Sequence, residues 1–282
     1  MVLPAPAIAR SLARTLLSPA QRQRLRHLRW RDSGHGYDRL GLHPAWVGAA
    51  LGVGRFFYEI YFRVSSHQAE NIPAEGAAIL AANHSGMLPL DGAMLYFDVV
   101  AHTHPPRVPR IAFDHFVPNL PFASVFFARV GAVSGARATV RRLLDDGELV
   151  GLFPEGTPGI GKPWAERYQL QHWRVGHAEL AIRHGAPVVP VAIIGAEEQW
   201  PQIGRIPWVH AFGAPYLPIP ATPVPLPVHY HVWYGEPLRL HERWPPVAAD
   251  DPEVCAQAAR EVKAAVQALI ERGLSQRPGV FQ

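Results

Sequence analysis

The chain contains 282 residues, of which 48% are hydrophobic and 18% are charged. That balance argues against an intrinsically disordered protein and is typical of a globular one with a substantial core. The formal net charge is only +4, but residues 1–40 carry eight arginines against two aspartates, so this segment is +6 and the remainder is −2.

The arginine-rich segment, residues 1–43, is expected to be partly helical and to end in the turn-like sequence SGHGYD. Basic terminal segments bind anionic surfaces, either membranes or nucleic acids, although a solvated helix face explains the same pattern. No recognised nucleic-acid-binding module accompanies the arginines, so we expect an anionic membrane surface and no nucleic acid as the partner. No signal peptide is evident, because a compact apolar run with a cleavage site is missing.

Residues 44–64 form the next element, an apolar stretch interrupted by Arg55, Glu59 and Arg63. A membrane-spanning helix needs about 20 nearly uncharged residues. We therefore expect an amphipathic helix that lies in the membrane interface, with a buried helix packed on the domain as the alternative. The interfacial reading places six aromatic residues near the lipid headgroups: Trp46, Phe56, Phe57, Tyr58, Tyr61 and Phe62.

The rest of the chain alternates short β-type runs with helical segments. The expected strands are 77–82, 110–113, 129–133, 149–153, 188–195 and 228–235, and the expected helices are 89–97, 119–127, 136–146 and 169–184. This alternation predicts an α/β fold with a mixed, largely parallel sheet flanked by helices. The simplest division is a basic, amphipathic helical extension over residues 1–64 and one domain over residues 65–282.

A last helix has the clearest end signals in the chain. Asp251 is expected to cap it, Pro252 to occupy its first position and Gly273 to end it. The single cysteine, Cys255, lies in this helix among alanines and cannot form an internal disulfide. We expect it to be buried and without a chemical role, which is consistent with a reducing compartment.

Polar residues that suit catalysis follow the first strand of the domain, in the sequence NHSGMLPLD of residues 83–91. Active sites of α/β proteins gather where strands end. His84 has the chemistry to take a proton from an alcohol, and a carboxylate on its other ring nitrogen improves it as a base. The alternative is a capping histidine near an aspartate that compensates a helix dipole.

Geometry decides whether His84 and Asp91 are able to meet. One continuous helix from residue 84 to residue 91 would separate them by about 10 Å along its axis. Gly86 and Pro89 indicate instead that the helix begins near Pro89, which puts Asp91 in its first turn and His84 in the preceding loop. That arrangement allows the two side chains to make contact.

Three further segments follow predicted strands. GAVSGAR, residues 131–137, leads into a helix whose first turn holds Arg137, a place that suits a phosphate group, although an ordinary surface arginine fits as well. FPEGT, residues 153–157, is a tight turn that leaves Glu155 projecting toward a substrate hydroxyl or simply toward solvent. GAPVVPVAIIGAEE, residues 185–198, carries no assigned chemistry and is expected to shape the cleft wall.

Taken in order, NHSGMLPLD, GAVSGAR, FPEGT and VVPVAI resemble the sequence blocks of the glycerolipid acyltransferase superfamily, the lysophosphatidic acid acyltransferase-like proteins. The resemblance covers roughly residues 65–200. It implies that His84 is the catalytic base and Asp91 its partner, and that Arg137, Glu155 and Gly156 hold the acyl acceptor. The adjacent Ser85 and Thr157 complete the expected substrate-binding set.

One departure separates the chain from the usual pattern of that superfamily. The family normally places four residues between the histidine and the aspartate, whereas this chain has six, which resembles the branch near the diacylglycerol acyltransferases and their bacterial relatives. A lysophospholipid is the first expected acceptor and a neutral glyceride the second. The implied acyl donor is a thioester of coenzyme A or of acyl carrier protein, with no metal and no further cofactor.

The sequence thus predicts an O-acyltransferase bound peripherally or monotopically to the cytoplasmic face of the cell membrane. Two alternatives remain open: a non-enzymatic lipid-binding protein with the same fold, and an acyl-thioesterase or lipase. A G-x-S-x-G sequence is missing, which argues against a serine hydrolase. A metal site at His102 and His104 is disfavoured by the prolines beside them and by the lack of acidic or cysteine neighbours.

Overall fold

The structure is a computed structural model that describes residues 5–86, 90–113, 123–160, 162–206, 208 and 217–282. Three helices open the chain, α1 (Ala5–Leu16), α2 (Pro19–Leu25) and α3 (Pro44–Arg55), and α3 continues into the π-helical segment Phe56–Tyr61. Helices α1 and α3 pack closely because α3 is small at the contact: a Cβ added to Gly52 would lie 2.7 Å from Leu16 Cβ. The basic segment is therefore folded as a helical layer.

A seven-stranded sheet forms the centre of the domain, with the order β1-β9-β6-β2-β5-β3-β4. Its strands are β1 (Ser65–His67), β2 (Ala78–Ala82), β3 (Arg110–Phe113), β4 (Val133–Ser134), β5 (Leu149–Leu152), β6 (Val188–Ile194) and β9 (His231–Tyr234). Every neighbouring pair is parallel except β6 and β9. The predicted mixed, largely parallel sheet is confirmed, and a separate hairpin joins β7 (Gln202–Ile206) to β8 (Leu217–Pro220).

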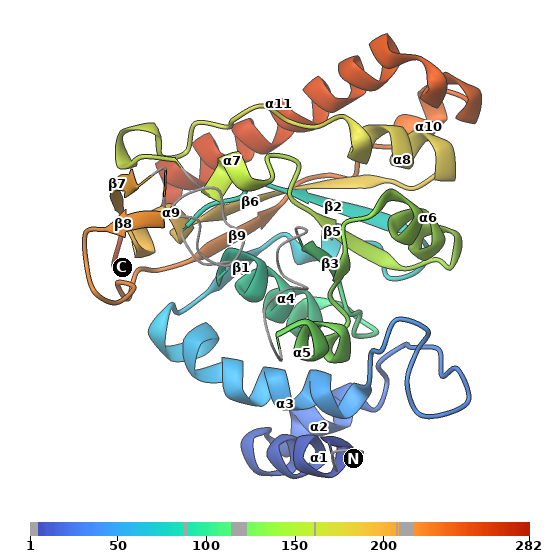
Figure 1. Cartoon of the computed structure of the whole chain (residues 1–282), viewed down its shortest axis with the longest axis vertical. Helices are drawn as coiled ribbons and strands as arrows, with labels where there is room; N and C mark the ends of the chain where they lie inside the picture. Colours follow the sequence, from blue (N-terminus) through green and yellow to red (C-terminus); the bar gives the residue numbers. More distant parts are fainter. Residues whose placement is uncertain (1–4, 87–89, 114–122, 161, 207, 209–216) are drawn as a thin grey trace.

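Helices cover both faces of this sheet (Figure 1). On one face lie α8 (Gly176–His184) and α11 (Pro252–Gln276), whose buried side chains pack with those of the strands in one apolar cluster. On the other face lies α4 (Leu90–His102), and α1 to α3 lie beyond it as a further layer. The remaining helices are α5 (Ala123–Val130), α6 (Arg137–Asp145), α7 (Thr157–Ile160), α9 (Ala196–Gln199) and α10 (Leu240–Arg243).

Several predicted elements were wrong in extent: the helix expected over residues 89–97 continues to His102, and two others differ more strongly. The strand expected over residues 129–133 begins in the end of α5, which extends to Val130, and only Val133–Ser134 pairs with β3. The helix expected over residues 169–184 begins at Gly176. In both cases apolar residues continue past the true boundary, so hydrophobic periodicity cannot locate it. The helix expected over 119–127 lies partly outside the described residues, which resume at Ala123.

The last helix begins as predicted but ends three residues later. The predicted cap is confirmed, because the Asp251 carboxylate accepts a hydrogen bond from Glu253 N at 2.8 Å. Gly273 lies inside the helix, where an added Cβ would approach Ile194 Cδ1 to 2.3 Å. This glycine therefore permits close packing of α11 on the sheet and does not stop the helix. Cys255 is buried, as expected.

The apolar segment 44–64 is partly exposed and partly packed on the domain. Phe56 and Phe57 are about half exposed, at 51% and 43%. Phe62, by contrast, is fully buried against Tyr230, with ring centroids 4.9 Å apart, so its expected position near lipid headgroups was wrong. The segment turns toward the sheet at its end because β1, the edge strand that pairs with β9, follows directly.

Candidate active site

The candidate site lies where β2 and β5 end side by side. These strands are parallel neighbours, so the loops that follow them meet at one edge of the sheet. Asn83 fixes the loop after β2, because its side chain donates to Ile193 O at 3.0 Å and accepts from Ile193 N at 2.7 Å. The start of the His84 loop is thereby tied to the neighbouring strand β6.

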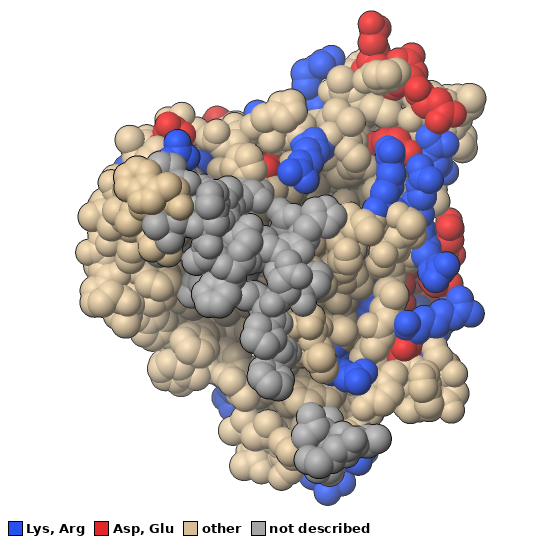
Figure 2. Space-filling model, viewed as in Figure 1, with Lys and Arg blue, Asp and Glu red and all other residues tan. Residues whose placement is uncertain are grey.

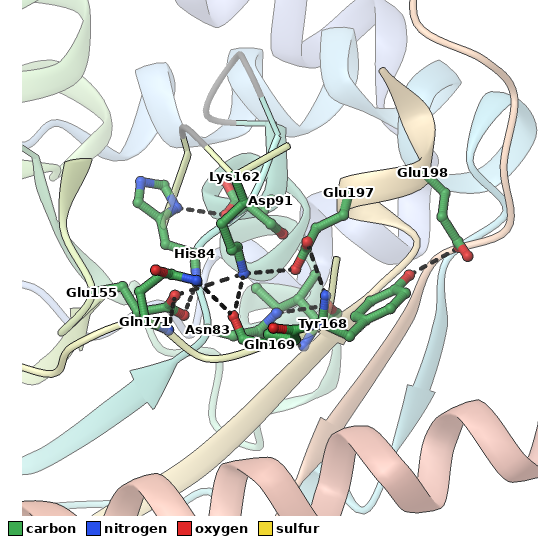
Figure 3. A network of polar contacts seen from close by, with 12 residues as sticks. Asn83, His84, Asp91, Glu155, Lys162, Tyr168, Gln169, Gln171, Glu197 and Glu198 are labelled. Atoms are coloured by element: carbon green, nitrogen blue, oxygen red, sulfur yellow. Dashed lines mark hydrogen bonds and ion pairs between the residues drawn. The ribbon is translucent and has the colours of Figure 1, made fainter. Parts of the chain in front are cut away.

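His84 and Asp91 are in contact, as the loop-and-helix geometry predicted. His84 Nδ1 lies 2.6 Å from Asp91 Oδ2, and Asp91 is fully buried in the first turn of α4 (Figure 3). The backbone N–H groups of Ser85 and Gly92 also donate to this carboxylate, at 2.9 and 2.7 Å. The predicted helix start at Pro89 lies outside the described residues, and Leu90 is the first described residue of α4.

The surroundings of the His84 ring favour its charged form. Burial on its own lowers the pKa of the imidazole, but the charge of Asp91 and the hydrogen bond to it outweigh burial, so the pKa of His84 is raised. The ring packs against Phe153 with centroids 4.4 Å apart, and 14% of the side chain remains exposed. With Nδ1 held by Asp91, Nε2 is the nitrogen left to meet a substrate.

Glu155 occupies a different position from the one expected. Its side chain is buried instead of projecting from the turn after β5. Oε1 accepts a hydrogen bond from His84 N at 3.2 Å, and Oε2 accepts one from Gln171 N at 3.0 Å. The carboxylate therefore joins two loops through their backbones, because buried N–H groups need acceptors that these loops do not otherwise supply.

Two charged residues beside Glu155 were missed by the sequence reasoning. Lys162 Nζ lies 2.9 Å from Glu197 Oε1 and 3.6 Å from Glu155 Oε2 (Figure 3). Burial raises the pKa of Glu197 to about 7, although Lys162 opposes that effect. One sequence signal was present: the chain has only two lysines, Lys162 and Lys263, among 27 basic residues.

Arg137 is not part of this cluster. It is the first residue of α6, and its guanidinium binds Glu179 of α8 at 2.5 and 3.1 Å while 58% of the side chain stays exposed. Strand β4, which precedes it, is three strand positions from β2, or roughly 14 Å across the sheet. Arg137 is thus placed beyond the immediate surroundings of His84.

The other expected substrate-binding residues, Ser85, Gly156 and Thr157, lie near the His84 loop or the turn after β5. Ser85 Oγ is buried and has no hydrogen-bond partner within the described part of the chain. Gly156 adopts a φ of +59° and lies beside the Arg174 guanidinium. Thr157 begins α7, but its side chain lies outside the described residues.

A narrow cleft, partly open to solvent, lies beside the His84 loop. Its lining includes Gly86, Gly159, Lys162, Trp164, Glu197 and Trp200. Gly159 connects it to the loop, because a Cβ added there would lie 2.8 Å from His84 O. In the described part of the chain, no three His, Cys, Asp or Glu side chains gather in a way that would hold a metal ion.

Comparison with known proteins places this geometry in a family. The family model described as Acyltransferase matches residues 63–194, a range that contains His84, Asp91 and Glu155. An uncharacterized protein of Mycobacterium tuberculosis is 36% identical over 268 residues, covering 90% of this chain and 74% of that protein. The bovine DGAT1/2-independent enzyme synthesizing storage lipids is 28% identical over 240 residues, covering 82% of this chain and 66% of that enzyme.

A solved structure supports the fold. The 1-acyl-sn-glycerophosphate acyltransferase of Thermotoga maritima superposes with a TM-score of 0.57 at 18% identity, covering 83% of each chain. At that identity the likeness shows the architecture alone. The family model and the 36% identical relative carry the assignment further: this chain belongs to the acyltransferase family and is an O-acyltransferase.

Proposed function

We propose that the protein transfers a fatty acyl group from a thioester to a hydroxyl group of a lysophospholipid or another glycerolipid, with His84 as general base. The contact between His84 Nδ1 and Asp91 Oδ2 at 2.6 Å carries the proposal. An imidazole held in this way keeps its Nε2 lone pair directed at a substrate, and the carboxylate stabilises the imidazolium that forms.

The proposed reaction proceeds by direct attack. His84 Nε2 takes the proton of the acceptor hydroxyl while that oxygen bonds to the thioester carbonyl carbon. The tetrahedral intermediate then collapses, the carbon–sulfur bond breaks, and the leaving sulfur takes the proton from the imidazolium. The products are an ester and a free thiol, and the imidazole is returned to its neutral form. Positioning and base catalysis together account for the rate gain in this scheme.

Arg137 remains our candidate for binding an anionic part of the acceptor. Its exposed guanidinium retains donors beyond the two that Glu179 engages. Basic side chains also gather on the side of the molecule where α6 and α8 lie (Figure 2). Its place away from His84 suits a headgroup better than the reacting hydroxyl. Ser85, Gly156 and Thr157 stay candidates for contacts nearer the reaction, whereas Glu155 shapes the site from within.

The N-terminal helices support attachment to a lipid surface. Val53, Phe56 and Ile60 are 55%, 51% and 62% exposed on α3 and its extension, and Ile8 of α1 is 54% exposed. Exposed arginines such as Arg10 accompany them. An apolar face bordered by cations suits an anionic membrane interface. Among the described residues, no helix is both long and apolar enough to cross a bilayer.

The acyl donor in this proposal is a thioester of coenzyme A or acyl carrier protein. A lysophospholipid is the first candidate acceptor, because a cation is available for its phosphate at Arg137. A neutral glyceride is the second candidate, favoured by the bovine relative, whose name describes synthesis of storage lipids. The two acceptors differ in charge, so Arg137→Ala should raise KM for the first and leave KM for the second unchanged.

The proposal is tested with labelled acyl thioesters and a panel of lysophospholipids and glycerides. His84→Ala should lower product formation by at least about 100-fold, the lower bound of a general base's usual contribution. His184→Ala is the matched control, because His184 pairs with Asp145 at 2.7 Å on the helices α8 and α6, outside the site. Full activity in His84→Ala would refute the proposed base. Free fatty acid without any acceptor would indicate a thioesterase or lipase, and binding without product a lipid-binding protein.

A further inference from the structure

Lys162 is an unusual residue in this chain. The sequence contains 27 basic residues, and all but Lys162 and Lys263 are arginines. The Lys162 side chain is only 3% exposed. A buried ammonium loses its hydration and is stable only with charged or polar partners around it. A lysine here, in a chain with 25 arginines and only one other lysine, fits a site that needs a compact ammonium charge instead of a planar guanidinium.

The partners of Lys162 come from two loops and the short helix α9. Its ammonium lies 2.9 Å from Glu197 Oε1 in α9, after β6, and 3.6 Å from Glu155 Oε2, after β5. Gln169 O accepts a hydrogen bond from it at 3.4 Å. Glu197 in turn accepts a hydrogen bond from Tyr168 N at 3.0 Å. Figure 3 shows the ammonium at the centre of these groups, so one charge holds together the loops that surround the strand ends.

The cluster reaches the reacting ring through Glu155. Oε1 of this carboxylate accepts from His84 N, and Oε2 faces both Gln171 N and the ammonium. The backbone of His84 is therefore held from one side by Glu155, while its ring is held from the other side by Asp91. Without the cation, a buried carboxylate would lack a counter-charge, and the bond that fixes the His84 backbone would weaken.

Lys162 also acts on the ring by its charge. The charged groups that face His84 are Asp91 on α4, Glu155 after β5 and Lys162 after α7. The two carboxylates favour the imidazolium, whereas the ammonium disfavours it. A base works best when its pKa lies near the operating pH, so a cation that opposes two carboxylates keeps the imidazole from becoming permanently protonated.

We propose that Lys162 is a positioning residue for acyl transfer, which holds the His84 loop through Glu155 and balances with its own charge the two carboxylates that face the imidazole. The inference rests on the proposed role of His84. It predicts effects on the turnover number and on the pH dependence, and it predicts little effect on the affinity for either substrate.

Three variants separate positioning from simple stability. Lys162→Met removes the charge at similar volume, Glu155→Gln removes the negative charge that holds His84 N, and Glu197→Gln breaks the same ion pair but leaves the ammonium beside Glu155. Each is first checked for folding by circular dichroism and urea unfolding. The turnover number and KM are then measured from pH 5 to pH 9 with the acceptor that the native enzyme uses.

Lys162→Met should lower kcat by about 10- to 100-fold with KM within about twofold, because small displacements of a catalytic group have such effects. The pH of half-maximal kcat on the acid side should rise, since His84 loses a repelling cation. Glu155→Gln should lower this pH of half-maximal kcat, which marks the acid limb of the pH profile, since the imidazolium loses a neighbouring anion. Glu197→Gln should leave the acid limb at its native pH or lower it.

Opposite shifts in Lys162→Met and Glu155→Gln support the proposal. A native kcat in folded Lys162→Met overturns it, as does a loss of kcat that follows stability in all three variants with no movement of the acid limb. If Lys162→Met does not fold, the direction of the shift in Glu155→Gln decides alone, and an unmoved or raised limb overturns the proposal. An active His84→Ala protein would defeat the proposed function itself, so the two failures are distinguishable.

Discussion

Replacing Asp91 by asparagine tests the catalytic pair with the smallest change of shape. Asp91 accepts three hydrogen bonds, from His84 Nδ1 and Ser85 N on Oδ2 and from Gly92 N on Oδ1. The asparagine amide has one oxygen, which accepts hydrogen bonds, and one NH₂ group, which only donates them. In either orientation the NH₂ group therefore faces an N–H group that needs an acceptor. If the oxygen faces His84, the NH₂ group meets Gly92 N. If the NH₂ group faces His84, the ring takes the tautomer that carries its proton on Nε2 and is no base.

The expected size of the effect follows from the lost charge. Two unit charges about 4 Å apart interact by about 4 kcal/mol at an effective dielectric constant of about 20. The transition state contains an imidazolium beside Asp91 and loses this stabilisation in Asp91→Asn. At about 1.4 kcal/mol for each tenfold change, kcat should fall roughly 10³-fold even in the orientation that preserves the tautomer.

The pH dependence of activity tests the same pair independently, through the direction in which the pKa of His84 moves. The pKa of native His84 is raised because the Asp91 carboxylate outweighs burial, and only the neutral ring is a base. Activity should therefore fall as the pH drops through this raised pKa. In Asp91→Asn the pKa falls, because burial remains while the carboxylate charge is lost, so the residual activity should persist to lower pH than in the native enzyme.

The assay measures product formation at saturating donor and acceptor between pH 5 and pH 9. Asp98→Asn is the matched control, since Asp98 is equally buried on α4 but binds Tyr58, Tyr234 and Ser66. It should lose stability and keep its rate per folded molecule. A folded Asp91→Asn enzyme within tenfold of the native rate, or one whose acid limb moves upward, would refute this account of the pair.

Three further outcomes follow from the structure. Burial lowers the pKa of His177 to about 4, so the unfolded chain takes up a proton at this residue first as the pH falls. From pH 7 to pH 4, the free energy of unfolding in urea should drop by about 3 kcal/mol more in the native protein than in His177→Phe, because His231 and the other titrating groups are common to both. Gly195 has a φ of +102°, and an added Cβ would lie 2.7 Å from His229 O, so Gly195→Ala should cost at least about 2 kcal/mol in urea unfolding. Gly185→Ala, with a φ of +63° and open space around it, should cost less. Phe56→Ser with Ile60→Ser should reduce sedimentation with anionic vesicles, whereas Val247→Ser, at a residue that is still more exposed, should not.

The sequence predicted the layered α/β fold because the buried parallel strands are short apolar runs bounded by turns. It also predicted the contact between His84 and Asp91, since both lie within one loop and the first turn of a helix. The position of Glu155 could not be predicted, because it depends on N–H groups in loops that are distant in sequence. Burial of Glu155 is a consequence of tertiary packing, which local turn chemistry does not report.

The ion pairs of Lys162 show the same limit more strongly. Its two carboxylates follow different strands, β5 and β6, and the three residues become neighbours only when β2 lies between those strands. Strand order is not encoded in hydrophobic periodicity. The short strand β1 and the hairpin of β7 and β8 were missed for a related reason: β1 has three half-buried residues, and the hairpin strands are exposed or half-buried at every position except Gln202.

Helix α4 connects the catalytic pair to the N-terminal helices. Asp91 lies in its first turn, and Phe97, six residues later, packs where Gly54 of α3 leaves room: a Cβ added to Gly54 would lie 2.1 Å from the Phe97 ring. Asp98, one residue further, accepts a hydrogen bond from Tyr58 at 2.5 Å. Six residues of helix span about 9 Å. Because one rigid helix makes both contacts, we infer that the exposed apolar face of α3 and the His84–Asp91 pair keep a fixed separation.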